Sequence, residues 1–320
     1  MKSLFRQIAG LGLTLACCAV LAQSASFPSR PITLVAATTP GGALDIAARM
    51  IQPELEKILK QTVIVENRPG AGAQVAAAYV AKSPPDGYTL LVSTGVALVP
   101  VFSKTPLVAL KNLTPISLLA EGPLLMVVPK ELPVKNMPEM FDYIRARPNK
   151  LNHATVGQGS AISLYFAWWK VKEKLDMQTI AYPGPGPIST ALLRGDVQMA
   201  LFGTGVAKAY IDTGKGKVIA VTGQKRLKEF PDVQTFDESG VPDIGGTMVA
   251  IHAAAGTPAA VVNQVHAALV QLSKAPEFVK RMEALNVVIT MSTPEELRQR
   301  EEADAKWSLE VARRTNLQPE

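Results

Sequence analysis

Apolar runs of strand length alternate with amphipathic stretches over the first third of the chain. Residues 31–37, 62–70 and 88–95 are strand-length apolar runs, whereas residues 43–60 and 73–83 between them carry apolar positions at helical spacing. Strands that are apolar along their whole length are buried on both faces, which is typical of parallel sheets. The order strand, helix, strand, helix, strand therefore predicts an α/β fold, a parallel sheet with helices on both faces.

The same alternation resumes after one or two long apolar extended runs in residues 115–130. The elements predicted beyond them are residues 137–148 (helix), 151–157 (strand), 160–175 (helix), 197–203 and 217–223 (strands), and 257–285 and 293–315 (helices). A length of 320 residues, 48% of them hydrophobic, fits two domains of roughly 150 residues each. No low-complexity linker separates the two α/β units, so ordered strands are expected to join them.

The first 25 residues have a pattern of their own. Lys2 and Arg6 precede an apolar run at 8–22, and small residues at 22–24 offer a cleavage site, so residues 1–25 are predicted to be a cleaved export signal. The apolar run, about 15 residues, is shorter than the roughly 20 residues that a membrane-spanning helix needs.

Composition and charge exclude several classes of site. Both cysteines, Cys17 and Cys18, lie in the predicted signal, so the mature chain is expected to have no disulfide, thiolate nucleophile or cysteine metal ligand. Lipidation at Cys17 stays open as an alternative to cleavage. The net charge is +6, but the basic residues are scattered and few aromatic residues lie among them. This pattern is typical of solvated faces and argues against a nucleic-acid-binding groove.

No catalytic constellation is recognisable in the sequence. The three histidines, His153, His252 and His266, have neither metal-ligand spacing nor a serine partner, and no Gly-x-Ser-x-Gly, His-Glu-x-x-His or P-loop motif occurs. His153, in an apolar strand, and His266, on an amphipathic helix, are predicted to be structural. The sequence therefore argues against an enzyme, and it predicts no catalytic residue, metal or cofactor.

Two glycine turns each follow a predicted strand and precede a predicted helix: TTPGG at 38–42 and GQGS at 157–160. Ligands of open α/β sheets bind at the carboxyl ends of strands, where helix N-termini present unpaired amides and glycine lets the backbone approach. The turns indicate either ordinary chain reversals or a cleft that grips a carboxylate from both units. Asp45, in the first turn of its helix, either stabilises that helix or pairs with a ligand ammonium or hydroxyl group.

Six stretches in register resemble the Bug family, the periplasmic receptors of tripartite tricarboxylate transporter systems. They are PGGALDIAAR (40–49), VIVENRPGAGA (63–73), PPDGYTLL (84–91), PNKLNHATVGQGS (148–160), FPDVQTFDESGVPD (230–243) and AAAGTP (253–258). The resemblance implies a two-domain, type II-like periplasmic binding protein with paired hinge strands and a central ligand cleft. The predicted division is residues 26–127 plus 249–320 for a discontinuous first domain and 128–248 for the second.

The same resemblance implies a function. Such a receptor captures a small carboxylated organic solute between its domains by hinge closure, without a cofactor, and delivers it to the membrane subunits of a tripartite tricarboxylate transporter. The chain is accordingly expected in the periplasm, as a monomer. The alternative is a ligand-sensing periplasmic protein that signals through a membrane receptor kinase or another partner.

Carrying the resemblance over position by position gives the expected ligand-binding residues. They are Thr38, Thr39, Pro40, Gly41, Gly42, Asp45, Gly157, Gln158, Gly159, Ser160, Ser163, Tyr182, Pro183, Gly184, Gly203 and Thr204.

The chain departs from the family pattern where the pocket walls are expected. Thr38 and Thr39 stand where an aromatic residue and an alanine are usual, and Ser163 stands where a histidine is usual. Met248 and Val249 replace a Trp-Phe pair. Fewer aromatic walls and more hydroxyl groups favour a polar aliphatic acid over a flat aromatic one.

Overall fold

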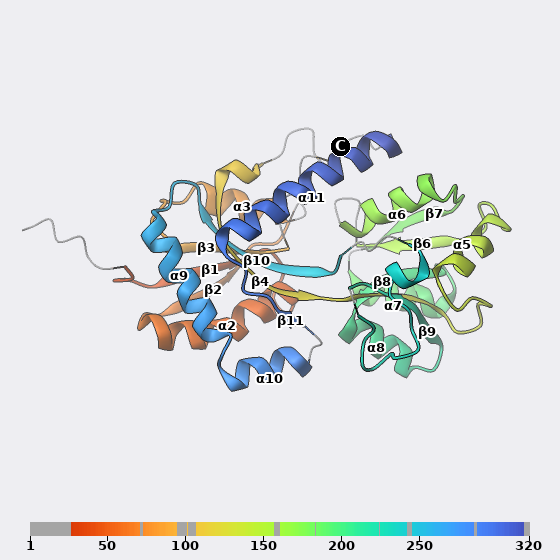
Figure 1. Ribbon diagram of the computed structural model, residues 1–320, viewed down its shortest axis with the longest axis horizontal. Coiled ribbons are helices and arrows are strands. Elements are labelled where there is room, and N and C mark those ends of the chain that lie inside the picture. The colour runs from red at the N-terminus through yellow and green to blue at the C-terminus, as the bar shows by residue number, and fades with distance from the viewer. Residues whose placement is uncertain are drawn as a thin grey trace, which may run out of the picture.

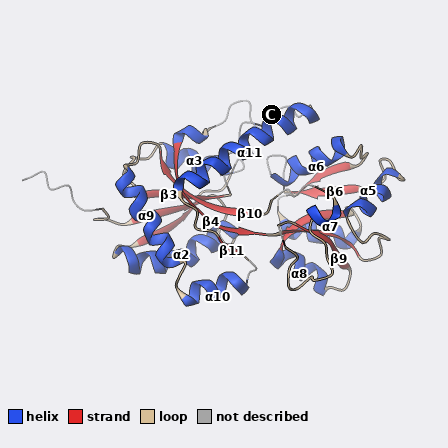
Figure 2. Ribbon diagram, viewed as in Figure 1, coloured by secondary structure: helices blue, strands red, loops and turns tan. Residues whose placement is uncertain are grey.

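The computed structural model shows two α/β lobes side by side, connected by long strands (Figure 1). The structure describes residues 27–70, 73–94, 101, 107–156, 161–182, 184–223, 225–241, 245–284 and 287–316. Within these residues, the first lobe contains a sheet of order β11-β4-β10-β3-β1-β2 and the second a sheet of order β7-β6-β8-β5-β9. Helices flank the strands of both sheets (Figure 2).

The first lobe starts with the predicted strand–helix alternation. Its elements are β1 (Ile32–Ala36), α2 (Ala43–Leu59), β2 (Val63–Asn67), α3 (Gln74–Ala81), β3 (Thr89–Ser93) and, later in the chain, α9 (Ala259–Leu272), α10 (Pro276–Ala284) and β11 (Val288–Ile289). β1 pairs in parallel with β2 and with β3, as predicted. Leu34 and Val35 are both fully buried but belong to different core clusters, because successive side chains of a strand point to opposite faces. Burial on both faces explains the nearly continuous apolar sequence of β1.

The second lobe repeats this organisation on a smaller sheet. Its elements are β5 (Leu124–Pro129), α5 (Met137–Arg145), β6 (Asn152–Thr155), α6 (Ala161–Lys172), β7 (Gln178–Ala181), α7 (Pro185–Arg194), β8 (Met199–Gly203), α8 (Thr204–Asp212), β9 (Gly216–Val221) and the short 3-10 helix η3 (Asp237–Ser239). One core cluster, with Phe141 and Trp169, covers one face, and another, with Ala191 and Tyr210, covers the other.

Two antiparallel strands cross between the lobes. The chain passes a 3-10 turn, η2 (Leu110–Asn112), then leaves the first lobe through β4 (Leu113–Gly122), and it returns through β10 (Thr247–Ala254). A Cβ on Gly246 would lie 2.0 Å from the carbonyl oxygen of Gly122, which shows how closely the two backbones approach at the crossing. The first sheet is therefore mixed: β1, β2 and β3 are parallel, as predicted for residues 31–95, whereas β10 is antiparallel to both β3 and β4. A chain that leaves a lobe and comes back beside itself must run in both directions.

Some elements differ from the sequence prediction. The single helical segment expected at 257–285 is two helices, because Pro276 disfavours helical geometry at Ala275 and starts α10. Neither α8 nor β10 was predicted from the apolar pattern. The last helix, α11 (Pro294–Thr315), was expected; its Thr293 side chain forms a capping box with Glu296.

The predicted domain limits, 127/128 and 248/249, fall inside β5 and β10 and stay predictions. A search of the described helices finds none with the length and apolar content that a membrane span requires.

Candidate ligand-binding site

The strand registers show that the carboxyl edges of the two sheets face each other. β10 comes from the second lobe, so Ser93, the last residue of the antiparallel β3 and the partner of Ala250, lies towards that lobe. The parallel β1 ends on the same side. In the second sheet, Gly203 at the end of β8 lies opposite Leu124, where β5 leaves the crossing. Because β6 and β7 run with β8, their carboxyl ends also point to the first lobe.

The TTPGG turn stands at this edge of the first lobe, between β1 and α2. Gly41 has φ +79°, in the left-handed region that L side chains rarely adopt. A Cβ on Gly42 would lie 2.2 Å from the Thr38 Oγ1 atom, so the chain is tight here. Gly42 is the N-cap of α2, and within the described chain no side chain caps this helix. The first-turn amides that a cap would occupy therefore stay available to an anion.

Asp45 stabilises this turn by hydrogen bonds. Its carboxylate, 4% exposed, accepts hydrogen bonds from the Gly41 amide at 2.9 Å, from Arg49 Nε at 3.0 Å to each oxygen, and from Asn67 Nδ2 at 2.9 Å. Asn67 Nδ2 also donates to the Thr38 carbonyl oxygen at 3.2 Å. The Arg49 hydrogen bond, followed by the Gly41 amide, lowers the pKa of Asp45 to about 2 despite burial. The described contacts make Asp45 an orienting residue; a contact with ligand stays a prediction.

Arg49 and Asn67 are not among the site residues predicted from the sequence. Arg49 follows Asp45 by one helical turn, a spacing that is readable in the sequence. Asn67 is 22 positions away and reaches Asp45 because β2 pairs in parallel with β1 and ends beside it. That relationship follows only from the strand register.

The second lobe presents two glycine-capped helices at its facing edge. Gly184 is the N-cap of α7 and Gly203 is the N-cap of α8, and in both helices the described residues provide no side-chain cap. A Cβ on either glycine would meet no atom of the described residues within 4 Å. Thr204 Oγ1, in the first turn of α8, is buried and has no hydrogen-bond partner among the described residues. A ligand oxygen would satisfy this hydroxyl.

The other predicted site residues divide into three groups. Thr39 and Pro40 are exposed in the TTPGG turn, and Tyr182, whose amide donates to Thr155 O at 2.9 Å, follows β7. Ser163 lies in the first turn of α6 and has an interaction partner. The remaining predicted residues lie outside the described chain: Gly157, Gln158, Gly159, Ser160 and Pro183.

Met248 and Val249 point to opposite faces of β10. Met248 packs on a small cluster that contains Leu118 and Leu297, whereas Val249 packs on the core of the first lobe. Both side chains therefore pack against hydrophobic clusters of the protein, whether or not they also line the ligand pocket.

The histidines are structural, as predicted for His153 and His266. His153 is fully buried, stacks on Phe166 with ring centroids 3.9 Å apart, and shares a 2.8 Å hydrogen bond between Nε2 and Thr179 Oγ1. Burial lowers the pKa of His153 to about 3, with Lys170 adding to the effect. His266 Nε2 lies 3.0 Å from the Ser292 carbonyl oxygen. No group of three potential metal ligands occurs among the residues that the structure covers.

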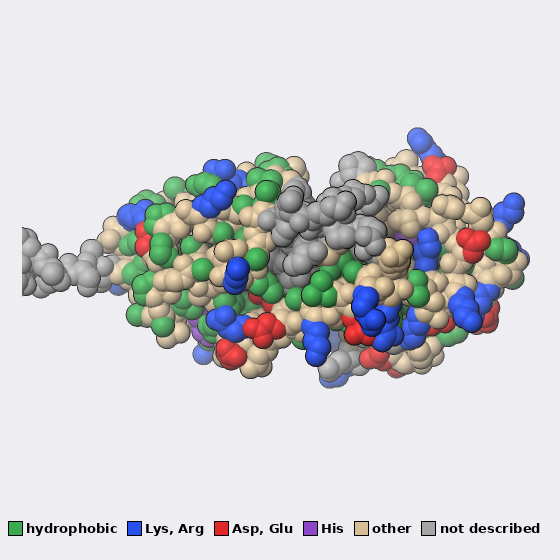
Figure 3. All heavy atoms as spheres, turned by 90° about the horizontal axis from the view of Figure 1, so that it is seen from above, with side chains coloured by type: hydrophobic (Ala, Val, Ile, Leu, Met, Phe, Trp, Pro, Cys, Tyr) green, Lys and Arg blue, Asp and Glu red, His purple; other side chains and the backbone are tan. Residues whose placement is uncertain are grey.

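The surface agrees with the charge pattern of the sequence. On the face seen in Figure 3, Lys and Arg side chains are interspersed with Asp and Glu side chains and form no continuous basic stripe.

Comparison with known families gives a match over most of the chain. The family model described as "Tripartite tricarboxylate transporter family receptor" matches residues 47–312. A UPF0065 protein from Bordetella pertussis (strain Tohama I) is 35% identical over 281 residues, which are 87% of this chain and 86% of that protein.

Solved structures give the same result. The periplasmic binding protein BugD matches with a TM-score of 0.79 and 28% identity, over 92% of this chain and 100% of BugD. Rpa4515 from R. palustris with adipate matches with a TM-score of 0.79 and 26% identity, over 92% and 100% of the two chains. MatC from Rhodopseudomonas palustris with bound malate matches with a TM-score of 0.76 and 30% identity, over 89% and 99%. BugD is described as a periplasmic binding protein, and the matching family model describes receptors of a transporter.

Proposed function

The chain belongs to the tripartite tricarboxylate transporter receptor family, and from this premise we propose that it captures a small aliphatic carboxylate between its two lobes. Hinge closure about β4 and β10 brings the TTPGG turn and the starts of α7 and α8 onto the ligand. The closed receptor then delivers the solute to the membrane subunits of its transporter. The protein works in the periplasm, after removal of residues 1–25, and as a monomer.

The observation that carries this proposal is the set of uncapped helix N-termini on facing sheet edges. Gly42, Gly184 and Gly203 each start a helix without a side-chain cap among the described residues, and all three follow strands whose carboxyl ends point towards the opposite lobe. Each helix start carries roughly half a positive elementary charge. Anionic groups are therefore favoured at both ends of a ligand that spans the lobes, which suits a dicarboxylate. The malate and adipate found in MatC and Rpa4515 are such compounds.

The residues expected to contact the ligand keep their predicted roles in this proposal. The Thr204 hydroxyl, buried and unpartnered within the described chain, supports a polar ligand group at the start of α8. Thr38 and Thr39 add hydroxyl groups where aromatic stacking is absent, which favours aliphatic acids over aromatic ones.

Thermal unfolding in the presence of candidate ligands tests the proposal. A ligand that binds only the folded state stabilises it, by about 2.7 kcal/mol at 100 times its dissociation constant. We expect malate, adipate or a related aliphatic dicarboxylate to raise the midpoint, while the matching diamides and benzoate leave it unchanged. The proposal is wrong if neutral or aromatic compounds raise the midpoint and no aliphatic carboxylate does.

A further inference from the structure

The C-terminal helix α11 connects the two lobes by side-chain contacts. With 22 residues it is about 33 Å long, enough to reach from one lobe to the other. Its first half is fixed to the crossing strands. Leu297 packs with Leu118 of β4 and Ala250 of β10. The Glu301 carboxylate accepts a hydrogen bond from His252 Nε2 at 3.0 Å, and both of these side chains are buried.

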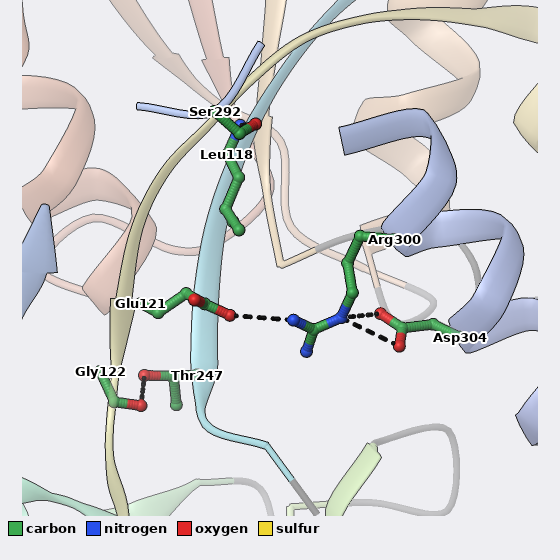
Figure 4. A network of polar contacts seen from close by, with 7 residues as sticks. All are labelled: Leu118, Glu121, Gly122, Thr247, Ser292, Arg300 and Asp304. Atoms are coloured by element: carbon green, nitrogen blue, oxygen red, sulfur yellow. Dashed lines mark hydrogen bonds and ion pairs between the residues drawn. The ribbon is translucent and has the colours of Figure 1, made fainter. Parts of the chain in front are cut away.

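Arg300 ties the same half of α11 to the end of the crossing. Its guanidinium contacts Asp304 at 3.1 Å and Glu121 of β4 at 3.3 Å (Figure 4). A Cβ on Gly245, just before β10, would lie 3.3 Å from the Arg300 guanidinium and 3.9 Å from the Tyr165 hydroxyl. The side chain of Arg300 therefore lies where β4, β10, α11 and α6 of the second lobe meet.

The second half of α11 packs on α6 of the second lobe. Val311 and Leu164 form a buried cluster and are 1% and 0% exposed. The rings of Tyr165 and Trp307 lie 5.3 Å apart between centroids, and the Arg314 guanidinium lies 5.5 Å from the Trp168 ring. Separation of the two helices would expose this apolar surface to water.

We infer that the contact between α6 and α11 stays intact during closure and acts as a pivot beside the hinge strands β4 and β10, so that the second lobe turns about both while the sheet edges approach. This inference rests on the proposed function for the motion itself. Packed interfaces resist opening, and a rotation that keeps this one intact costs less than one that separates it. Tyr165, Trp307 and Arg300 are then positioning residues, which set ligand affinity without touching the ligand.

Distances between paired spin labels test the pivot directly. In a chain carrying C17S and C18S, introduced cysteines are the only thiols. Labels at V171C of α6 and L309C of α11 report on the pivot, and labels at K57C of α2 and L193C of α7 report on the lobes; all four positions are exposed. With malate or adipate added, we expect the first distance to stay constant and the second to change.

The result without ligand separates this inference from the proposed function. If no aliphatic carboxylate binds, the proposed ligand class is wrong, but the pivot still requires a narrow distance distribution between positions 171 and 309 and a broader one between positions 57 and 193. With or without a bound ligand, the pivot is wrong if the distance between positions 171 and 309 varies as much as the distance between positions 57 and 193.

A variant pair adds an independent readout. W307A removes the ring that faces Tyr165, whereas L309A alters an exposed position on the same helix. We expect W307A to broaden the first distance distribution and to weaken ligand binding at least threefold, with L309A equal to wild type. A W307A protein that unfolds less stably but keeps the wild-type distance distribution and affinity contradicts a positioning role.

Discussion

The Asn67 side-chain amide donates to the Asp45 carboxylate at 2.9 Å and joins the end of β2 to the turn that follows β1. The same amide nitrogen donates to the Thr38 carbonyl oxygen, and Asp45 accepts the Gly41 amide. Two side chains outside the turn thus fix both of its ends. Asp45 therefore orients the backbone of the turn that the proposed ligand contacts.

Replacement of Asn67 tests the orienting network. N67A removes the side-chain donor of the Thr38 carbonyl and leaves Asp45 Oδ1 with Arg49 Nε alone, so we expect about 1–2 kcal/mol lower stability and a weaker affinity for carboxylate. Q52A is the matched control, since Gln52 Nε2 donates to the Val63 carbonyl at 2.8 Å at the opposite end of β2. Denaturant unfolding and calorimetric titration should show a stability loss in both variants and an affinity loss only in N67A. Equal affinities in both variants would remove the turn from the ligand site.

Substitution of Gly41 by alanine tests whether this turn serves ligand binding in addition to the chain reversal. At φ +79° an alanine costs about 1–2 kcal/mol, and its Cβ would meet no described atom within 4 Å. G214A is the control, because Gly214 has φ +74°, equally open surroundings, and a position between α8 and β9 away from the facing edges. We expect similar stability losses in the two variants, measured by thermal unfolding. Only G41A should reduce ligand affinity, and an unchanged affinity in G41A contradicts the proposed grip.

The low pKa of Asp45 predicts that the stability of the folded protein decreases in acid. Its pKa is about 2 in the folded protein and 3.8 as the ordinary value, so the folded state holds the proton less tightly than the unfolded state. The stabilisation, about 2 kcal/mol, is complete above pH 3.8 and is lost as the pH falls through about 2. Unfolding of wild type and D45N should differ most at neutral pH and converge towards pH 2. A difference that is independent of pH shows that the carboxylate charge is not the stabilising feature.

His153 acts in a higher pH range. Burial lowers its pKa from 6.5 to about 3, so the folded protein keeps the ring neutral while the unfolded chain takes up a proton. Stability should therefore fall as the pH drops below 6.5, by about 1.4 kcal/mol per pH unit until about 3. In a H153Q variant this part of the slope should be absent, as measured by denaturant unfolding between pH 7 and 4. The same slope in both proteins would assign the acid sensitivity to other groups.

The sequence predicts the local elements better than their assembly. The turn at 38–42, the buried β1 and the first-turn position of Asp45 follow from apolar spacing and glycine chemistry, which act over a few residues. The antiparallel direction of β10 and the Asn67–Asp45 contact depend on which strands become neighbours. The contact of Trp307 with Tyr165 joins residues far apart in the chain, and apolar periodicity alone names no partner for either ring. Length and apolar alternation predict two α/β units, and the family resemblance adds the paired hinge strands and the ligand cleft between them.

Calorimetric titration of G203D and G203A with the dicarboxylate that stabilises wild type tests the central claim most directly. Gly203 has φ −65°, and an added Cβ would meet no described atom within 4 Å, so either side chain fits among the described residues. Asp is a favoured N-cap residue that should maintain or raise the stability of α8. The added carboxylate occupies the first-turn amides and repels an anionic ligand. The account predicts that G203D folds normally and binds at least tenfold more weakly, while G203A stays within about threefold of wild type. Wild-type affinity in a folded G203D protein would contradict a carboxylate held at the start of α8.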